Sequence, residues 1–571
     1  MNNQSISIAV AGSGGAGAMT TGNALFDAAA KVGWYGILSR TVGPQIRGGE
    51  AAAMLRLSAE PSSGPDDFFD VLLAIDWKNI ERFAPEIPLN ADSLIICDVK
   101  AGDVPEEIAR SGARILQLPI ADTAKKVKNG RPNMVALGIL AKMVDLPEAT
   151  VASLLESKLN SKGEQAVQSS LETVVLGREL AADLPTLAHF AGATPATGQR
   201  WVISGNEATG LGAIRGGVRF VAAYPITPAT EVLEWLAPQL PKVGGTLVQA
   251  EDELSSINML IGASFGGVPS LTSTSGPGLS LMTESLGLAV AAEVPLVVVD
   301  VMRGGPSTGI PTKPEQSDLN IAVYGLHGDA PHLVLAPLSV EDCIFTTQWS
   351  VCLAEALQTP AIVLSDQFLG QARAIIDKPV DLAFIAQRKV SDQPGEDFAR
   401  YAVTADGISP MPIPGTAGGQ YVAEGLAHSP VGLPSTRTDH HSEQMDKRLR
   451  KLADFNYGDH WADIEGDGET AVISWGLAAT ASREAVRRLR DQDVAVKLIA
   501  VRLISPVQPE KMVQALEGVK RVLVIELNHS GQFYRFMRAH YDMPAEVKTL
   551  NRPSPLVIRP GEIMHKIKAW S

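Results

Sequence analysis

The sequence predicts an α/β protein with three α/β domains, and three observations lead to this prediction. Short apolar segments alternate with helical segments along most of the chain, which is typical of sheets whose strands are joined by helices. Several apolar segments, such as Leu296–Val299, are apolar on both faces, which suits a sheet covered on both sides. The length of 571 residues also allows three or four domains at ~100–200 residues each.

The first domain is predicted over residues 1–192. It opens with a strand of alternating pattern at Ile6–Ala11, followed by a glycine turn and an Ala-rich helical stretch. The further strands expected in this domain are Val71–Ile75, Ser93–Cys97 and Ala113–Leu118. Because these strands alternate with helical segments, we expect a parallel sheet.

The second domain is predicted over residues 193–388, and its α/β unit begins at Trp201. Its expected strands are Phe220–Ala223, Gly245–Gln249, Ser270–Ser273, Leu296–Val301 and Ala361–Leu364. Residues 389–466 are rich in Gly and Pro and are predicted to form an extended linker with one helix. A connection this long is usually functional or wraps a neighbouring domain.

The third domain is predicted over residues 467–571, where strands and helices alternate again. The expected order is strand Ala471–Trp475, helix Thr480–Gln492, strand Ala495–Val501, helix Pro509–Leu516 and strand Val522–Glu526.

Composition and charge exclude several classes of function. The formal net charge is −14, and an acidic surface argues against general nucleic-acid binding. The three cysteines, Cys97, Cys343 and Cys352, form no C-x-x-C pair, so we expect neither a metal site nor an iron–sulfur cluster in this chain. The N-terminal residues lack a signal-sequence pattern, and the most apolar stretch, Leu286–Met302, is too short and too interrupted to span a membrane. We therefore expect a cytoplasmic protein.

A glycine turn near the N-terminus fits the pattern G-x-G-x-x-G over Gly12–Gly17, between a predicted strand and a helix. Such a turn can bind an anion with its backbone amides, although close packing of strand and helix explains it equally well. A site for NAD should also have an acidic residue at the end of the second strand. Residues Gly36–Thr41 contain none, which argues against an NAD-linked oxidoreductase.

A second glycine-rich segment follows at Gly43–Gly49 and contains Arg47. It would lie near the carboxyl edge of the sheet, where open α/β sheets bind ligands. Gly43, Arg47, Gly48 and Gly49 are therefore candidates for ligand binding or for an interface loop.

The middle domain carries four features that each follow a predicted strand. Tyr224–Pro228 brackets Thr227 with prolines, and Glu251–Glu253 places three carboxylates before a helix of small and apolar residues. Thr272–Gly278 is a turn rich in hydroxyls and glycine, and Arg303 follows the strand at Leu296–Val301. Arginine can bind a planar carboxylate through two parallel hydrogen bonds. Together these features predict a hydroxyl, a carboxylate and an arginine at the carboxyl ends of strands in one sheet.

These segments resemble the α subunit of the 2-oxoacid:ferredoxin oxidoreductases, with the γ domain fused ahead of it, over nearly the whole chain. The combination of Tyr224–Pro228 with Arg303–Gly309 is the most specific part of the resemblance. Further similar segments are Gly12–Gly17, Gly43–Gly49, Asn133–Gly138, Glu251–Glu253, Thr274–Gly278, Asp406–Pro410 and Glu526–Gln532. The resemblance implies a γ domain, a domain that binds the pyrimidine of thiamine diphosphate, and a C-terminal domain similar to that of transketolases.

The resemblance also implies roles for individual residues. Glu253, rather than Glu251 or Asp252, would contact the pyrimidine ring nitrogen as the catalytic acid–base group. The segment Thr274, Ser275, Gly276 and Pro277 would complete the cofactor site. Thr227 and Arg303 would bind the substrate carboxylate and act as catalytic residues, and the Gly43–Gly49 segment is a candidate for coenzyme A binding or for an interface.

A complete enzyme of this family needs groups that this chain lacks. We find neither the Gly-Asp-Gly start of a metal–diphosphate site nor cysteines for a [4Fe–4S] cluster. Thiamine diphosphate would thus be shared with a smaller β subunit that carries Mg²⁺ and the [4Fe–4S] cluster. The expected assembly is a (γα)₂β₂ heterotetramer that reduces ferredoxin and uses coenzyme A as a substrate.

The fused γα form and the Arg303 segment favour 2-oxoglutarate, so we expect the reversible conversion of 2-oxoglutarate, coenzyme A and oxidised ferredoxin into succinyl-CoA, CO₂ and reduced ferredoxin. The alternatives are the same chemistry on pyruvate or on a branched or aromatic 2-oxoacid, an NAD-linked oxidoreductase, and an inactive scaffold subunit. The joint presence of Thr227, Glu253 and Arg303 argues against the scaffold.

Overall fold

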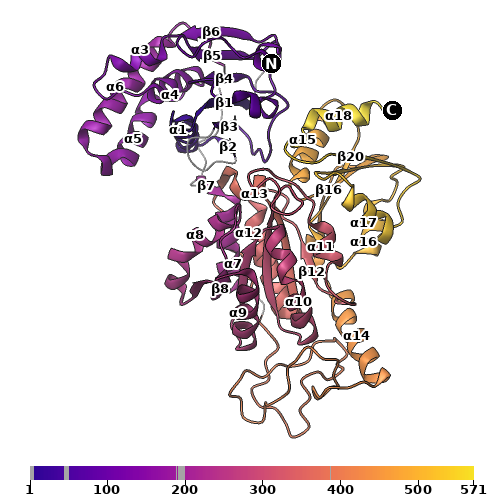
Figure 1. Cartoon of the computed structure of the whole chain (residues 1–571). Coiled ribbons are helices and arrows are strands. Elements are labelled where there is room, and N and C mark those ends of the chain that lie inside the picture. The colour runs from indigo at the N-terminus through magenta and orange to yellow at the C-terminus, as the bar shows by residue number, and fades with distance from the viewer. Residues whose placement is uncertain are drawn as a thin grey trace. The chain divides into compact units, whose positions relative to one another are not determined.

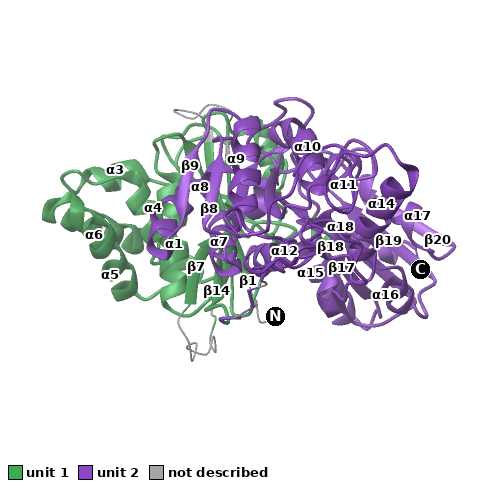
Figure 2. Cartoon of the chain, turned by 90° about the horizontal axis from the view of Figure 1, so that it is seen from below, with its two compact units in different colours: residues 1–204, 371–380, 559–562 green, residues 205–370, 381–558, 563–571 purple. Residues whose placement is uncertain are grey.

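The computed structural model describes residues 5–43, 50–187, 190, 200–382, 384–385 and 387–570. The strands form three sheets (Figure 1). The residues divide into two compact units (Figure 2): one contains 1–204, 371–380 and 559–562, and the other contains 205–370, 381–558 and 563–571. The predicted domain boundaries at residues 192, 388 and 466 differ from this division into two units, and they stay a prediction.

The first unit is built on an eight-stranded sheet of order β6-β5-β4-β1-β3-β2-β14-β7. Its strands are β1 (Ser5–Ser13), β2 (Tyr35–Val42), β3 (Glu50–Ser58), β4 (Val71–Ala74), β5 (Leu94–Asp98), β6 (Arg114–Leu118), β7 (Arg200–Ser204) and β14 (Arg373–Asp377). Strands β1, β4, β5 and β6 are parallel, as expected, whereas β3, β2, β14 and β7 pair in antiparallel fashion.

The four strands named from the sequence correspond to the parallel strands β1, β4, β5 and β6, and the antiparallel half of the sheet was not predicted. Only residues 43–49 separate β2 from β3, and a parallel crossover needs a dozen or more. Strand β7, where we expected the second unit to begin, instead pairs with β14 in this first sheet. Six helices accompany the sheet, and they are α1 (Ala18–Lys31), α2 (Glu106–Ala109), α3 (Ile120–Lys125), α4 (Pro132–Met143), α5 (Glu148–Leu159) and α6 (Glu164–Leu180).

The second unit contains the middle sheet, which has the order β18-β12-β13-β11-β10-β8-β9. Its strands are β8 (Phe220–Ala223), β9 (Thr246–Gln249), β10 (Ser270–Thr274), β11 (Leu296–Met302), β12 (Leu333–Leu335), β13 (Pro360–Asp366) and β18 (Leu503–Ser505). All neighbours are parallel except β12 and β18. The five predicted strands are confirmed, and β12 and β18 were not predicted.

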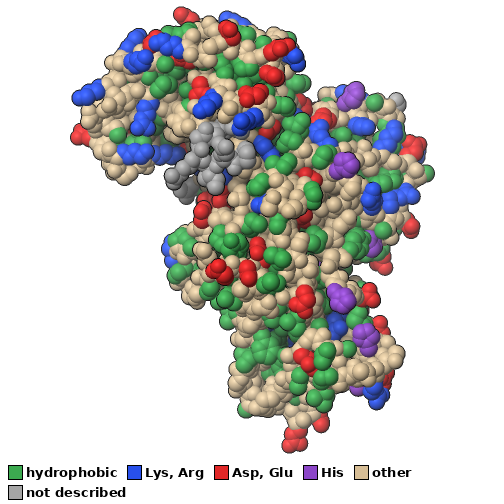
Figure 3. All heavy atoms as spheres, viewed as in Figure 1, with side chains coloured by type: hydrophobic (Ala, Val, Ile, Leu, Met, Phe, Trp, Pro, Cys, Tyr) green, Lys and Arg blue, Asp and Glu red, His purple; other side chains and the backbone are tan. Residues whose placement is uncertain are grey.

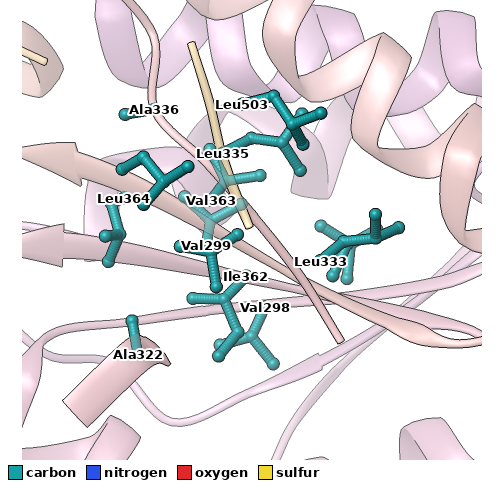
Figure 4. Close-up of a cluster of buried hydrophobic side chains, with 14 of the residues drawn as sticks. Val298, Val299, Ala322, Leu333, Leu335, Ala336, Ile362, Val363, Leu364 and Leu503 are labelled. Carbon is teal, nitrogen blue, oxygen red and sulfur yellow. The ribbon is translucent and has the colours of Figure 1, made fainter. Parts of the chain in front are cut away.

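Helices surround the middle sheet, and the apolar strands pack into a continuous core. The helices are α7 (Gly205–Gly216), α8 (Thr230–Gln239), α9 (Glu253–Phe265), α10 (Gly276–Ala291), α11 (Leu319–Tyr324), α12 (Asp342–Leu357) and α13 (Gln367–Gln371). Figure 4 shows side chains from β11, β12 and β13 in contact range of Ala322 and of Leu503, which comes from the C-terminal part of the chain. One core therefore joins the middle and C-terminal sheets.

The segment after the middle sheet contains the predicted helix, α14 (Thr438–Ala453), and buried charges hold this helix in place. The Glu293 carboxylate accepts hydrogen bonds from Lys447 Nζ at 2.6 Å and from Lys451 Nζ at 3.0 Å. All three side chains are buried. A buried charge requires such partners, so this cluster anchors the linker on the middle domain.

The C-terminal sheet has the order β15-β17-β16-β19-β20. Its elements are β15 (Ala462–Glu465), β16 (Thr470–Trp475), α15 (Ala478–Arg490), β17 (Lys497–Val501), α16 (Pro509–Ala515), β19 (Arg521–Glu526), α17 (Gln532–His540), β20 (Glu546–Asn551) and α18 (Pro560–Lys568). Short 3₁₀ turns occur at Ile80–Arg82, Ala84–Glu86, Asn160–Lys162, Leu240–Val243 and Gly458–Trp461. The predicted strand–helix alternation of this region is confirmed, and β15 and β20 extend the sheet at both edges.

Acidic and basic side chains of the described residues are interspersed on both units, on the face shown in Figure 3. No helix in the described part of the chain is long and apolar enough to cross a bilayer. Among the same residues, no group of three or more His, Cys, Asp or Glu side chains is arranged to hold a metal ion.

Candidate active site

The topology of the middle sheet marks a ligand-binding edge. The chain runs from β8 to β9 on one side and then returns to place β10 on the other side of β8. Connections that leave two adjacent parallel strands in opposite directions open a crevice at the carboxyl ends of those strands. The residues that follow these strand ends are therefore the candidates for a ligand site.

Four of the predicted site features lie at this edge. Strands β11, β10, β8 and β9 are adjacent in that order, and their carboxyl ends lead to Arg303, to Thr274 and Ser275, to Thr227 and to Glu253, respectively. The parallel arrangement brings these segments to one side of the sheet. The sequence-based expectation that they share one edge is met by the strand order.

The three carboxylates after β9 have different environments. Glu251 is exposed, and Asp252 is the N-cap of α9, where its carboxylate accepts a hydrogen bond from the Ser255 amide at 2.6 Å. That bond holds the Asp252 pKa below its ordinary value. Glu253 begins the helix and is only 6% exposed. Only Glu253 thus combines burial with a position that is not used for capping.

The Glu253 carboxylate lies against the first turn of α10. A Cβ atom on Gly278 would come within 2.6 Å of Glu253 Oε1 and within 2.1 Å of Thr274 Oγ1. Glycine at this position is therefore what allows the carboxylate to approach the turn.

Ser275 has a buried hydroxyl group that the described protein atoms leave without a hydrogen-bond partner. It occupies the N-cap position of α10, yet its side chain makes no capping bond. Leaving a buried polar atom unsatisfied costs about 1–3 kcal/mol. This orphaned hydroxyl indicates that a polar ligand atom belongs beside the turn.

Arg303 lines the same cleft as Gly276 and Pro277 of this turn and is 7% exposed. Its Nη1 atom donates a hydrogen bond to the Thr227 carbonyl oxygen at 2.6 Å, while the Thr227 side chain is exposed. The structure thus brings Arg303 and Thr227 together through the main chain of Thr227. The predicted role of the Thr227 hydroxyl in carboxylate binding stays a prediction.

Arg303 borders a cleft with a volume of about 690 Å³ within the second unit. One wall comes from Gly276, Pro277 and the loop between β11 and α11, and the facing wall comes from the C-terminal domain. The C-terminal residues that line the cleft are Asn528, His529, Ser530, Gln532, Pro553 and Ser554. The sequence analysis assigned no site role to this wall. The segment Glu526–Gln532 pointed to it, but this segment was noted only as part of the family resemblance.

Hydrogen bonds in both directions hold this C-terminal loop on the middle domain. The Gln316 amide donates to the Leu527 carbonyl at 2.7 Å, and the Leu527 amide donates to Gln316 Oε1 at 2.8 Å. Gln532 Nε2 donates to the Ser317 carbonyl at 2.8 Å. Behind the loop, the buried Glu526 carboxylate accepts from the amides of α17. The second cleft wall is therefore fixed by the fold.

Two further carboxyl groups, Asp300 and Asp318, lie beside Arg303. Asp300 is fully buried on β11, in register with Thr274 of β10. Asp318 packs against the turn, because a Cβ atom on Gly276 would come within 2.6 Å of Asp318 Oδ2. Burial raises the pKa of Asp300 well above its ordinary value and raises that of Asp318 to about 6. Sequence reasoning missed this pair; its one signal was a carboxylate inside an apolar strand.

In the glycine turn of the first unit, the Asp76 carboxylate already binds Ser13. The Ser13 amide and hydroxyl both donate to the Asp76 carboxylate, at 2.9 Å and 2.7 Å. The Ser13 amide therefore already has an anionic partner, which argues against phosphate binding at this amide. Gly43 is buried at the end of β2, whereas Arg47, Gly48 and Gly49 lie outside the described residues.

Three family models match separate parts of the chain. Residues 7–180 match the family pyruvate ferredoxin/flavodoxin oxidoreductase. Residues 211–447 match its thiamine-diphosphate-binding domain, and residues 468–563 match core domain II of pyruvate:ferredoxin oxidoreductase.

Individual relatives extend over most of the chain. The 2-oxoglutarate synthase subunit KorA of Methanothermobacter marburgensis is 38% identical over 377 residues, which cover 65% of this chain and 98% of that subunit. The 2-oxoacid:ferredoxin oxidoreductase subunit alpha of Saccharolobus solfataricus is 29% identical over 92% of each chain. The solved structure of 2-oxoglutarate:ferredoxin oxidoreductase from Magnetococcus marinus, with 2-oxoglutarate, coenzyme A and succinyl-CoA bound, is 38% identical and covers 100% of both chains with a TM-score of 0.92.

Both the match to a nearly complete KorA subunit and the match of the whole fold point to one family. The chain belongs to the 2-oxoacid:ferredoxin oxidoreductases, as an α subunit with the γ domain fused ahead of it.

Proposed function

We propose that this chain is the γα subunit of a 2-oxoglutarate:ferredoxin oxidoreductase. The enzyme would convert 2-oxoglutarate, coenzyme A and oxidised ferredoxin into succinyl-CoA, CO₂ and reduced ferredoxin, and the reverse. The observation that carries the proposal is the placement of buried Glu253 and Arg303 beside the first turn of α10, at the switch point of the sheet. The choice of 2-oxoglutarate is supported by the relatives named above.

The residues at this turn fit the aminopyrimidine part of thiamine diphosphate. A ring nitrogen that gains a proton needs a carboxyl partner in a site with little water, and Glu253 supplies one. The Ser275 hydroxyl lacks a protein partner and can bond a polar atom of the ring. Thr274, Gly276 and Pro277 complete the turn. When bound, the cofactor supplies an electron sink for decarboxylation of the 2-oxoacid.

Arg303 would bind the carboxylate that neighbours the keto group. Its guanidinium borders the cleft, and its Nη1 is fixed by the Thr227 carbonyl, so the plane of the group is oriented before substrate arrives. Pre-orientation reduces the loss of side-chain freedom on binding. The exposed Thr227 side chain would contribute its hydroxyl to the same carboxylate.

The remaining groups of the reaction would come from partners. The chain forms part of a multi-subunit enzyme, as the subunit names of its relatives indicate. We propose a β subunit that carries Mg²⁺, the diphosphate site and the [4Fe–4S] cluster, with ferredoxin as acceptor and a (γα)₂β₂ assembly in the cytoplasm. Coenzyme A would be the acyl acceptor, with Gly43, Arg47, Gly48 and Gly49 as candidate contacts or interface residues.

A substrate screen tests this function. The chain is purified with its partner subunit and supplied with 2-oxoglutarate, pyruvate, or a branched or aromatic 2-oxoacid, with and without coenzyme A. We expect dye reduction that depends on coenzyme A and is fastest with 2-oxoglutarate. Preference for pyruvate would contradict the substrate assignment, and reduction that depends on NAD instead of 2-oxoacid would contradict the reaction class.

A further inference from the structure

The carboxyl pair Asp300 and Asp318 has no role in the reaction as described so far. Asp300 is fully buried, and neither of its carboxyl oxygens has a hydrogen-bond donor among the described residues. The Asp318 Oδ2 atom is likewise buried without a donor. Both groups lie beside the guanidinium of Arg303. A buried pair of this kind next to the substrate-binding arginine calls for an explanation.

Chemistry restricts the charge of the pair. Two carboxyl groups can hydrogen-bond to each other only if one of them carries a proton, because two carboxylates present only acceptors. Asp300 is the more buried group, and its pKa lies well above that of an ordinary aspartate. Burial also raises the pKa of Asp318 above its ordinary value, and the nearby Arg303 guanidinium partly offsets this rise. Because the Asp300 carboxyl group is fully buried and has no donor, the proton of the pair belongs to Asp300, and the negative charge belongs to Asp318, which lines the cleft.

Few other charges face this pair. Arg303 interacts with both members, and Glu315, on the loop before α11, interacts with Asp318. Burial raises the Glu315 pKa as well, and His529 of the C-terminal loop partly offsets this effect. The negative charge of the pair is thus the main counter-charge of Arg303, and it competes with any carboxylate that binds Arg303 from the cleft.

We propose that Asp300 and Asp318 act as positioning residues for Arg303 and that the pair takes up a second proton when the carboxylate of the 2-oxoacid binds. In the free enzyme, the negative pair orients and partly neutralises the guanidinium. In the complex, the substrate carboxylate becomes the counter-charge, and a proton from solvent neutralises Asp318. The charge balance at Arg303 is then unchanged, with one carboxylate and one proton gained. This proposal rests on the function proposed above.

The expected coupling follows from the electrostatics. A new negative charge within ~8 Å favours protonation of a partly buried carboxylate by roughly 10- to 100-fold. The carboxyl pKa is then higher in the complex than in the free enzyme, so the affinity for the 2-oxoacid rises as pH falls. The affinity rises over the pH range between the higher Asp318 pKa of the complex and the Asp318 pKa of the free enzyme, about 6. The total gain in affinity is the same roughly 10- to 100-fold.

Calorimetry measures this coupling directly. The complex of this chain with its partner subunit is loaded with 3-deazathiamine diphosphate, whose ring cannot attack the keto group, and is titrated with 2-oxoglutarate. Titrations in two buffers of different ionisation enthalpy at pH 6 to 8 give the number of protons taken up. The wild-type complex should take up a substantial fraction of one proton near pH 7.

Two isosteric variants separate positioning from a purely structural role. Asp318→Asn removes the negative charge, so binding should become independent of pH, without proton uptake, and roughly tenfold tighter than wild type at pH 8. Asp300→Asn leaves Asp318 ionised with an amide donor, so uptake should also vanish, but affinity should stay at the weak, high-pH level. A gain of affinity at pH 8 in the first variant and none in the second is not expected if the two residues only support the fold. Glu315→Gln should retain the proton uptake.

Several outcomes would overturn the proposal. Zero uptake in the wild-type complex would contradict it, as would uptake that persists in Asp318→Asn. Loss of uptake in Glu315→Gln alone would assign the proton to Glu315 instead. Absence of 2-oxoglutarate binding altogether would overturn the proposed function as well, whereas binding without proton uptake overturns only the present proposal.

Discussion

Gly278 of α10 gives the most specific test of the site geometry. In Gly278→Ala, the new Cβ atom would stand 2.6 Å from Glu253 Oε1 and 2.1 Å from Thr274 Oγ1. Favourable contacts need about 3.5 Å, so the Glu253 carboxylate must retreat by roughly 1 Å. A displacement of that size at a reacting group costs on the order of 100-fold in rate. Overpacking should also cost about 1–3 kcal/mol of stability.

Gly287 in the same helix provides the matched control. A Cβ atom there would meet nothing within 4 Å, so Gly287→Ala should stabilise the helix by about 0.5–1 kcal/mol and leave activity unchanged. The assay is kcat and thiamine diphosphate affinity of the reconstituted complex, together with thermal unfolding of each variant. If Gly278→Ala retained activity within a few-fold of wild type, the Glu253 carboxylate would not lie where the reaction needs it.

Three further predictions follow from the same structure. Arg303→Lys keeps the charge but loses the two-pronged geometry, so kcat/KM for the 2-oxoacid should fall by about 10- to 150-fold, or about 1.5–3 kcal/mol. The affinity for the cofactor should hardly change. A collapse of cofactor affinity with an unchanged KM would refute this prediction. Burial raises the Asp366 pKa to about 7, so the folded state binds this proton more tightly than the unfolded state does. The free energy of unfolding should therefore decrease as pH rises from about 4 to 7, by at most about 4 kcal/mol. Asp366→Asn should therefore unfold at nearly the same temperature at pH 5 and pH 8, and a wild-type-like loss of stability at pH 8 would argue against this cause. The chain purified alone should show no iron–sulfur absorption, since Cys97 and Cys343 are buried apart from any cluster motif, and a stoichiometric cluster spectrum would refute the assignment of the cluster to a partner.

The sequence predicted the middle sheet well because its strands are apolar on both faces, a pattern that a doubly covered parallel strand imposes. It failed where pairing is decided by distant segments. Strand β12 has only the residues Leu333–Leu335, and β18 joins it from the C-terminal part of the chain. The antiparallel β2 and β3 were missed because the length of the connection, not the pattern of either strand, decides their direction.

The sequence predicted which residues of the candidate site follow the ends of strands. Arg303 and Glu253 follow two strands of one parallel sheet, and local sequence reveals that. It could not rank Glu251, Asp252 and Glu253 by burial, because Glu253 lies against the first turn of α10, which is distant from it in the sequence. Nor could it place Asn528 in the cleft wall, since this residue reaches Gln316 across 212 positions of sequence. Such groups become neighbours only in the folded chain.

The central claim is that Glu253 activates thiamine diphosphate at the first turn of α10. The most direct measurement is the rate of hydrogen–deuterium exchange at the thiazolium C2 position of the cofactor bound to the complex, compared between wild type and Glu253→Gln, with the exposed Glu251→Gln as control. Glutamine keeps the shape but cannot exchange the proton, so the rate should fall by ~10²–10⁴ in Glu253→Gln and stay unchanged in Glu251→Gln. Equal exchange rates in Glu253→Gln and wild type, with the cofactor bound, would contradict the account.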